Sequence, residues 1–183
     1  MKRLWEDKKQ VFIILMVVEA AGILMLTKYG YHWLKILRYL LLMGFLVPLA
    51  FIDHEKTIIP NKILLVLFGI RVVLLGGEML MFPDYRKDIL LSSGAGLAVG
   101  LVIFLLAYVL SRKSIGLGDV KLAGVLGWYL GASLIWFDIV VCLLLSAVFC
   151  IIQLARKKLS LKDSIPLAPF FSIGTILILL LGF

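Results

Sequence analysis

The chain has 183 residues, of which 63% are hydrophobic and 16% charged, and its mean hydropathy is +1.11. These values exclude a soluble domain with a polar surface. The net charge of +8 does not indicate nucleic-acid binding, because no basic stripe with interleaved aromatic residues lies in a water-soluble segment. We therefore expect an all-α, polytopic integral membrane bundle that forms a single domain over residues 1–183.

Successive apolar runs predict about seven transmembrane helices, since a spanning helix needs about 20 mostly apolar residues. The runs cover approximately residues 11–27, 33–52, 62–82, 89–110, 119–135, 136–154 and 164–183. The first run resembles a secretory signal peptide, but Glu6 and Asp7 dilute its basic region and apolar sequence continues past the small residues Ala20 and Ala21. We interpret residues 1–32 as an extra retained span and residues 33–183 as the core bundle.

The distribution of basic residues predicts the orientation of the bundle, because Lys and Arg in short loops stay on the cytoplasmic side. With the N-terminus inside, cytoplasmic basic residues outnumber outer ones by about two to one. The outer group is then Lys28, Lys35, Arg38, Arg71, Arg86 and Lys87. We therefore expect a cytoplasmic N-terminus, with the cytoplasmic group of basic residues lying against anionic lipid headgroups.

Two polar stretches interrupt the apolar pattern. FIDHEKTIIPNKI, residues 51–63, places Asp53 at the end of the second predicted span, and Pro60 restarts the chain as a helix. SIGLGDVKLAG, residues 114–124, places Asp119 at the start of the fifth span, after Gly116 and Gly118, which permit close backbone approach. Because two spans separate the two aspartates, both must emerge on the same face, which the charge count makes cytoplasmic.

The two aspartates allow either a structural or a catalytic interpretation. Taken singly, Asp119 could cap a helix and Asp53 could mark a helix end. However, ionisable residues at membrane depth are costly and tend to face a bundle interior or an aqueous cavity. Two neighbouring carboxyl groups share a proton more readily than both ionise, so one can activate water and the other can protonate a leaving amine. The pair predicts peptide hydrolysis, and a small transporter or channel using paired acids is the alternative from another class.

Other polar residues do not suggest a different chemistry. His54 and Glu55 beside Asp53 do not form a recognisable metal set, and no CxxC motif occurs, so we expect no metal and no cofactor. His32 and His54 are predicted on opposite faces, which argues against a serine triad. Lys121 could stabilise a carboxylate or extend to the headgroups, and Glu19 is expected to be buried and paired.

Three motifs together resemble a known family. Asp53 with Ile59, Pro60 and Asn61 forms D-x5-I-P-N, Gly116 to Leu122 reads GLGDVKL, and residues 165–170 read IPLAPF. From about residue 38 onward the chain resembles the type IV prepilin leader peptidases, membrane aspartyl proteases of the GxGD class.

This resemblance implies an endopeptidase in the inner membrane of a prokaryote. The enzyme would remove, at the cytoplasmic face, the short basic leader of prepilin-like precursors (pilins, pseudopilins or archaellins) that serve type IV pili and protein secretion. It also implies that Asp53 and Asp119 are the catalytic pair, that Gly116 and Gly118 shape the loop, and that Lys121 and Pro60 occupy supporting positions.

The chain departs from the larger bacterial members, which carry a zinc-binding insertion with paired CxxC motifs that accompanies N-methylation. The resemblance is therefore to short, peptidase-only members, and methyl transfer is not expected. The first span lies outside the resemblance. Presenilin-like proteases, which cut within a membrane helix, also share GxGD, but this chain scrambles their Pro-Ala-Leu motif as Pro166, Leu167 and Ala168. They remain the alternative among enzymes.

Overall fold

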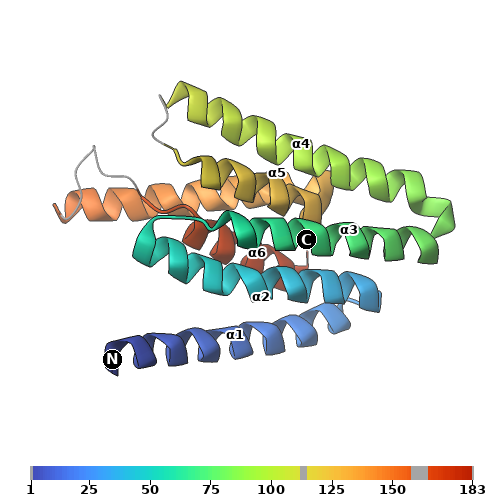
Figure 1. Cartoon of the computed structure of the whole chain (residues 1–183), viewed down its shortest axis with the longest axis horizontal. Coiled ribbons are helices and arrows are strands. Elements are labelled where there is room, and N and C mark those ends of the chain that lie inside the picture. Colours follow the sequence, from blue (N-terminus) through green and yellow to red (C-terminus); the bar gives the residue numbers. More distant parts are fainter. Residues whose placement is uncertain (1, 112–114, 158–164, 183) are drawn as a thin grey trace.

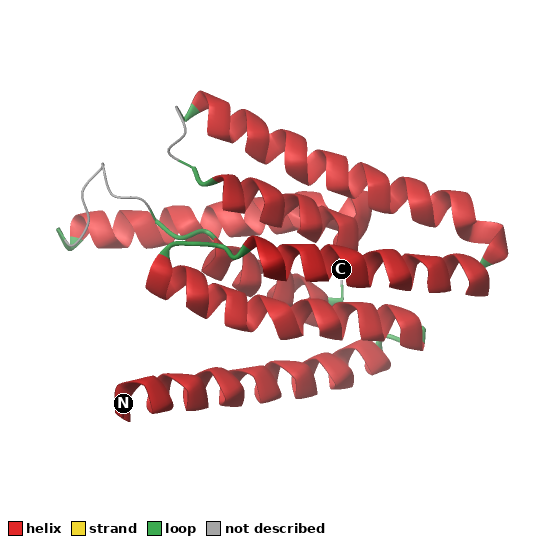
Figure 2. Cartoon of the chain, viewed as in Figure 1, coloured by secondary structure: helices red, strands yellow, loops and turns green. Residues whose placement is uncertain are grey.

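The computed structural model describes residues 2–111, 115–157 and 165–182, and these residues form helices joined by short connections (Figures 1 and 2). The elements are α1 (Lys2–Lys28), α2 (Trp33–Lys56), α3 (Asn61–Met81), the short 3-10 helix η1 (Pro83–Tyr85), α4 (Arg86–Leu110), α5 (Leu117–Ala155) and α6 (Ala168–Leu181). Within the described ranges there is no strand. The prediction of an all-α fold is confirmed.

Five segments are long and apolar enough to cross a membrane. They lie in α1, α2, α3, the stretch that contains α4, and α5, whereas α6 has 14 residues and is shorter. The fifth and sixth predicted runs are joined in the structure as α5, which has 39 residues. The count of about seven spans and the cytoplasmic N-terminus stay predictions.

The helix α5 is interrupted at Gly131, where φ is 80° and ψ is 176°. Such a positive φ favours glycine, because a side chain is strained there. The interruption divides α5 into residues 117–130 and residues 132–155, and in Figure 1 the second part turns back toward the end of the bundle where the first part begins. The sequence analysis placed this boundary between residues 135 and 136, which was too late, because an unbroken apolar pattern runs through the turn.

Contacts with neighbouring helices show that the two parts of α5 run in opposite directions. Residues 117–130 run parallel to α3, since Lys121 contacts Asn61 and Tyr129 contacts Leu67. Residues 132–155 run antiparallel to α6, since Phe149 lies near Phe170 and Asp138 lies near Thr175. Both α3 and α6 are antiparallel to α2, so the chain reverses at Gly131.

The helices α4 and α5 approach closely through glycines. A Cβ atom on Gly96 of α4 would overlap the carbonyl oxygen of Gly127 in α5, and one on Gly127 would overlap the carbonyl oxygen of Gly96. Gly100 packs in the same way against the carbonyl oxygen of Ala123. Small residues of this kind let helix backbones pack tightly in a membrane. This packing fixes residues 117–130, which carry the GLGD motif at their first turn.

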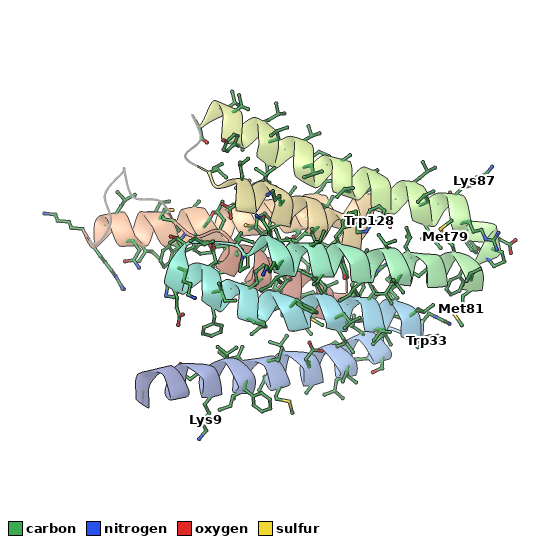
Figure 3. The ribbon with its side chains drawn as sticks, in the orientation of Figure 1. Lys9, Trp33, Met79, Met81, Lys87 and Trp128 are labelled. Carbon is green, nitrogen blue, oxygen red and sulfur yellow. The ribbon has the colours of Figure 1, made fainter. Side chains whose placement is uncertain are left out.

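Large apolar side chains cover the outside of the bundle, as expected for a surface in contact with lipid. Leu65 and Val73 of α3 and Leu110 of α4 are all highly exposed. Figure 3 shows side chains extending outward from α1, α3 and α4. The core between the helices is also apolar and includes Leu42, Leu46 and Leu126. The few buried charged side chains are therefore the features that need explanation.

Candidate active site

Asp53 lies in the last turn of α2, with its side chain turned into the bundle. The residue is 3% exposed. The helix ends where Thr57 adopts a left-handed conformation, and the Thr57 N–H donates to the Asp53 carbonyl oxygen (N···O 2.8 Å). The Asp53 Oδ2 accepts a hydrogen bond from the backbone N–H of Ala168 (3.1 Å). Because Ala168 begins α6, this N–H has no partner within its own helix, and the carboxylate supplies one.

Asp119 lies in the first turn of α5. Its Oδ2 accepts a hydrogen bond from the Gly116 N–H (3.2 Å), and its own N–H donates to the Gly116 carbonyl oxygen (3.1 Å). The helix begins at Leu117, so the prediction that the span starts at Asp119 was two residues too late. The carboxylate still stabilises the helix start by accepting a free backbone N–H.

The structure brings the two aspartates together at one end of the bundle, where α2 ends and α5 begins (Figure 1). The carboxylates are close enough for the charge of Asp53 to act on Asp119. Gly118 packs on Ile59, since a Cβ on Gly118 would lie 3.0 Å from the Ile59 Cβ. The absence of a side chain at Gly118 therefore lets the GLGD turn rest on the I-P-N segment.

Lys121 and Pro60 support this arrangement indirectly. Lys121 forms no ion pair with either carboxylate among the described residues. The Lys121 Nζ donates to the Asn61 Oδ1 (3.0 Å), which ties the first turn of α5 to the first turn of α3. Pro60 immediately precedes α3, with φ of −66°, as predicted for a helix start. The three motifs are thus joined by three contacts: Gly118 with Ile59, Lys121 with Asn61, and Ala168 with Asp53.

The other residues considered from the sequence lie apart from this cluster or on its outside. His54 and Glu55 are exposed. No group of three His, Cys, Asp or Glu side chains that could hold a metal ion occurs in the described parts of the chain. Glu19, expected to be buried and paired, is only half-buried and makes no hydrogen bond or ion pair within those parts.

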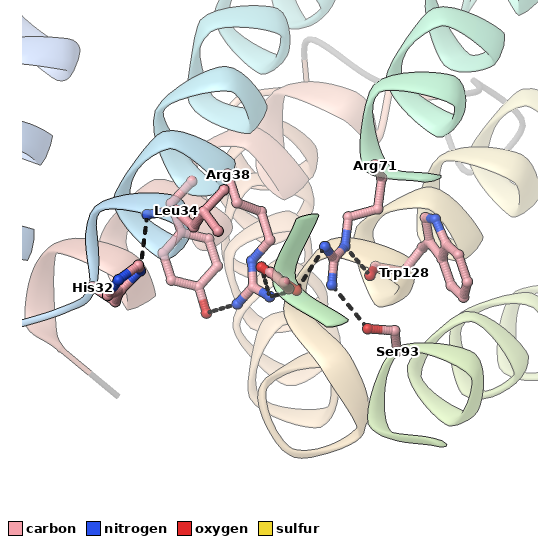
Figure 4. Close-up of polar contacts among 8 residues, drawn as sticks. His32, Leu34, Arg38, Arg71, Ser93 and Trp128 are labelled. Carbon is pink, nitrogen blue, oxygen red and sulfur yellow. Dashed lines mark hydrogen bonds and ion pairs between the residues drawn. The ribbon is translucent and has the colours of Figure 1, made fainter. Parts of the chain in front are cut away.

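A buried ion cluster that was not predicted from the sequence lies near the opposite end of the bundle (Figure 4). Arg71, assigned from the sequence to the outer basic group, lies within α3 and is 0% exposed. Its Nη1 pairs with Glu78 Oε2 at 3.0 Å, and its Nη2 donates to Ser93 Oγ at 2.9 Å. Arg38 Nη1 pairs with Glu78 Oε1, also at 3.0 Å. The spacing of seven residues between Arg71 and Glu78 places them on one helix face, a signal that could have revealed the pair.

Arg71 also holds the end of the first part of α5. Its Nε donates to the carbonyl oxygen of Trp128 (3.1 Å), three residues before the interruption at Gly131. The last carbonyls of a helix lack intrahelical donors, and a cation at that end is favourable. Residues 117–130 are therefore fixed at both ends, by Arg71 at one and by the contacts around Asp119 at the other.

Comparison with known proteins agrees with the first two motifs, which both lie within the matched residues. A model described as the type IV leader peptidase family matches residues 40–155. The chain is 29% identical over 153 residues to a prepilin leader peptidase/N-methyltransferase of Legionella pneumophila, covering 81% of this chain and 51% of the relative. It is also 29% identical over 146 residues to a protein of the same description from Aeromonas salmonicida (strain A449), covering 78% of this chain and 48% of the relative. The chain thus spans about half the length of these curated relatives, and no solved structure matches it.

Proposed function

The chain belongs to the type IV leader peptidase family, and from this premise we propose that it is a membrane aspartyl endopeptidase that removes the short basic leader from prepilin-like precursors. Asp53 and Asp119 are the catalytic pair in this proposal. The observation that carries it is their convergence at one end of the bundle, from helices separated by α3 and α4, with the GLGD turn packed on the I-P-N segment that follows Asp53.

The environment of the pair suits acid–base chemistry. Each carboxylate accepts one backbone N–H, from Ala168 or from Gly116, and neither has an ion-pair partner among the described residues. A neighbouring cation would hold a carboxylate in its ionised form. Since no ion pair holds either carboxylate among the described residues, two close carboxyl groups can share a single proton, as in the aspartic proteases.

Hydrolysis then follows in two steps. The ionised carboxylate takes a proton from water as the water oxygen bonds to the peptide carbonyl carbon, while the protonated carboxyl group donates to the carbonyl oxygen. The resulting tetrahedral intermediate collapses as the protonated carboxyl group gives its proton to the amide nitrogen, the ionised carboxylate takes a proton from one of the two hydroxyl groups, and the C–N bond breaks. The leader leaves with a new C-terminal carboxyl group, and the mature subunit leaves with a free amine.

The proposed reaction takes place at the cytoplasmic face of the inner membrane of a prokaryote, with no metal or cofactor. The helix ends near Asp53 and Asp119 carry Lys56, Lys62 and Lys121, and this basic character supports a cytoplasmic location by the positive-inside rule. A precursor whose hydrophobic helix lies in the bilayer would present its cleavage site at the same depth as the two aspartates, which are at helix ends.

The test uses the purified chain in detergent with a prepilin-like substrate that bears a basic leader. We expect the wild type to release the leader, and Asp53→Asn and Asp119→Asn each to reduce cleavage below about one thousandth, because either change removes one member of the acid–base pair. Cleavage is measured by the mass of the two products.

Asp84→Asn is the matched control, since Asp84 is an exposed acid at the other end of the bundle. It should cleave at the wild-type rate. Melting temperatures near that of the wild type would show that both inactive variants are folded. Wild-type cleavage by Asp53→Asn or by Asp119→Asn would contradict the aspartyl mechanism, and ion flux through the wild type without cleavage would favour a transporter.

A further inference from the structure

A second polar region lies at the end of the bundle opposite the two aspartates. It is a cavity of about 420 Å³ bordered by the beginnings of α2 and α4, the end of α3 and the interruption in α5. Four charged side chains line it, namely Lys35, Arg38, Glu78 and Asp88. Nothing in the proposed peptidase reaction uses this cavity.

The cavity and the ion cluster behind it carry one positive charge in excess. Glu78 is shared by two guanidinium groups, Arg38 and Arg71, each at 3.0 Å. Lys35 has no ion-pair partner among the described residues, and its Nζ lies 3.8 Å from the centre of the Tyr31 ring. Asp88 is the remaining acid, and it lies at the exposed rim. A negatively charged ligand would therefore be attracted to Lys35 and Arg38.

Hydrogen-bond donors are also left without acceptors in this cavity. The Arg38 Nε is buried and has no hydrogen-bond partner in the described parts of the chain. An unpaired buried N–H of a charged group is costly. His32 accepts the Leu34 N–H at its Nδ1 (3.4 Å), so the other ring nitrogen of neutral His32 is a donor. A phosphate oxygen in the cavity could accept from the His32 ring, and its negative charge would offset the cost of the buried Arg38 Nε without contacting that atom.

The surroundings of the cavity match the interface between lipid headgroups and acyl chains. Tyr29, Trp33 and Tyr85 are exposed at this end of the bundle, and Trp and Tyr are enriched at membrane interfaces. The cavity wall is otherwise largely apolar and includes Phe82 and Ile89. A ligand with both a charged headgroup and apolar chains fits this wall better than a fully hydrated ion does.

We propose that this cavity binds the phosphate group of an anionic phospholipid, with Lys35 and Arg38 contacting the phosphate and the acyl chains lying against the apolar wall. The inference is independent of the peptidase reaction, because it rests on residues at the other end of the molecule. It assigns the ammonium of Lys35 and the free ring nitrogen of His32 to one ligand.

The test measures lipid binding by native mass spectrometry on the full chain in detergent, with phosphatidylglycerol and phosphatidylcholine added in turn. We expect one phosphatidylglycerol to bind in preference to phosphatidylcholine. Lys35→Gln should weaken phosphatidylglycerol binding about five-fold, the effect of one basic residue facing an anionic lipid. Lys35 makes no ion pair in the described parts, so this variant should fold. Arg38→Gln should weaken binding at least as much, with its melting temperature recorded because it also loses the contact with Glu78.

Lys87→Gln is the control, since Lys87 is an exposed cation in the first turn of α4 at the same end of the bundle and outside the cavity wall (Figure 3). It should bind phosphatidylglycerol like the wild type. If Lys35→Gln and Lys87→Gln weakened phosphatidylglycerol binding equally, the binding would be a general attraction to the basic surface, and the proposal would be overturned. Unchanged binding by Lys35→Gln would also overturn it. Displacement of the lipid by an equal concentration of inorganic phosphate would identify a free anion as the ligand and exclude the phospholipid.

Discussion

The two ends of the bundle treat buried charge in opposite ways. At one end, the carboxylate of Glu78 lies between two guanidinium groups, and Arg71 makes further hydrogen bonds to Ser93 and Trp128. At the other end, Asp53 and Asp119 lie near each other, each with one backbone N–H and no ion pair among the described residues. Opposite charges placed together hold helices in position, whereas like charges placed together weaken the fold and are expected where they perform chemistry.

Removing the shared acid should give the largest loss of stability. Glu78→Gln would leave Arg38 and Arg71 without a counter-charge, one of them fully buried. Breaking a buried ion pair from one side costs about 3–5 kcal/mol, because an uncompensated charge remains. We expect a clear fall in the melting temperature in detergent and a reduced yield of folded protein.

The control for this change is Glu55→Gln, which alters an exposed acid at the other end of the bundle and should leave the melting temperature unchanged. If Glu78→Gln melted like the wild type, the ion cluster would not be what holds this end together. The contrast between the two ends would then lose its basis.

A smaller effect is expected from the close contact that positions the first part of α5. Gly127→Ala would place a Cβ against the carbonyl oxygen of Gly96 and force α4 and α5 apart. Overpacking of this kind costs about 1–3 kcal/mol. The variant should melt at a lower temperature and cleave more slowly, since residues 117–130 carry Asp119. Gly69→Ala is the control, because nothing lies within 4 Å of that site, and it should match the wild type in both measurements.

The aspartate end could be predicted from the sequence because it depends mainly on counting. Two spans between Asp53 and Asp119 put them at one end of the bundle, whatever the details of packing, and D-x5-I-P-N and GLGD are local patterns. The contact between Ala168 and Asp53 joins residues 115 positions apart. Nothing local in either segment specifies this contact, so it required the fold.

The ion cluster of Arg38, Arg71 and Glu78 at the other end could not be predicted from the sequence in the same way. A count of basic residues by loop treats each one as lying outside the membrane, and it therefore placed the buried Arg71 in a loop. The reversal at Gly131 was predicted only approximately, between residues 135 and 136, because the residues around it are apolar and only the positive φ of the glycine marks the turn. The burial of Arg71 and the turn at Gly131 both depend on how the helices pack in the folded chain. Hydrophobicity along the sequence does not reveal this packing.

A still smaller effect should follow from breaking the tie between α3 and α5. Lys121→Ala removes the hydrogen bond to Asn61, which lies at the exposed surface. A hydrogen bond of this type is worth about 0.5–1.5 kcal/mol, so we expect cleavage to slow by about two- to ten-fold with little change in melting temperature. Asn61→Ala should have the same effect, and the double variant should be no slower than either single one. Lys62→Ala, an exposed neighbour, serves as the control, and additive losses in the double variant would show that the two residues act separately.

The smallest change in stability is expected where the change in activity is greatest. Asp53→Asn is the same chemical substitution as Glu78→Gln, a carboxylate replaced by its amide, but it removes a like-charge contact with Asp119 instead of a counter-charge. The amide oxygen of Asn can still accept the Ala168 N–H. The free energy of unfolding should therefore stay within about 0.5 kcal/mol of the wild-type value or rise, while cleavage is lost. Asp53→Leu cannot accept that N–H, so its free energy of unfolding should fall by about 1–3 kcal/mol, with a lower melting temperature. A large loss of stability in Asp53→Asn would mean that this carboxylate holds the fold together as Glu78 does, and the two ends of the bundle would then differ only in the sign of their charge.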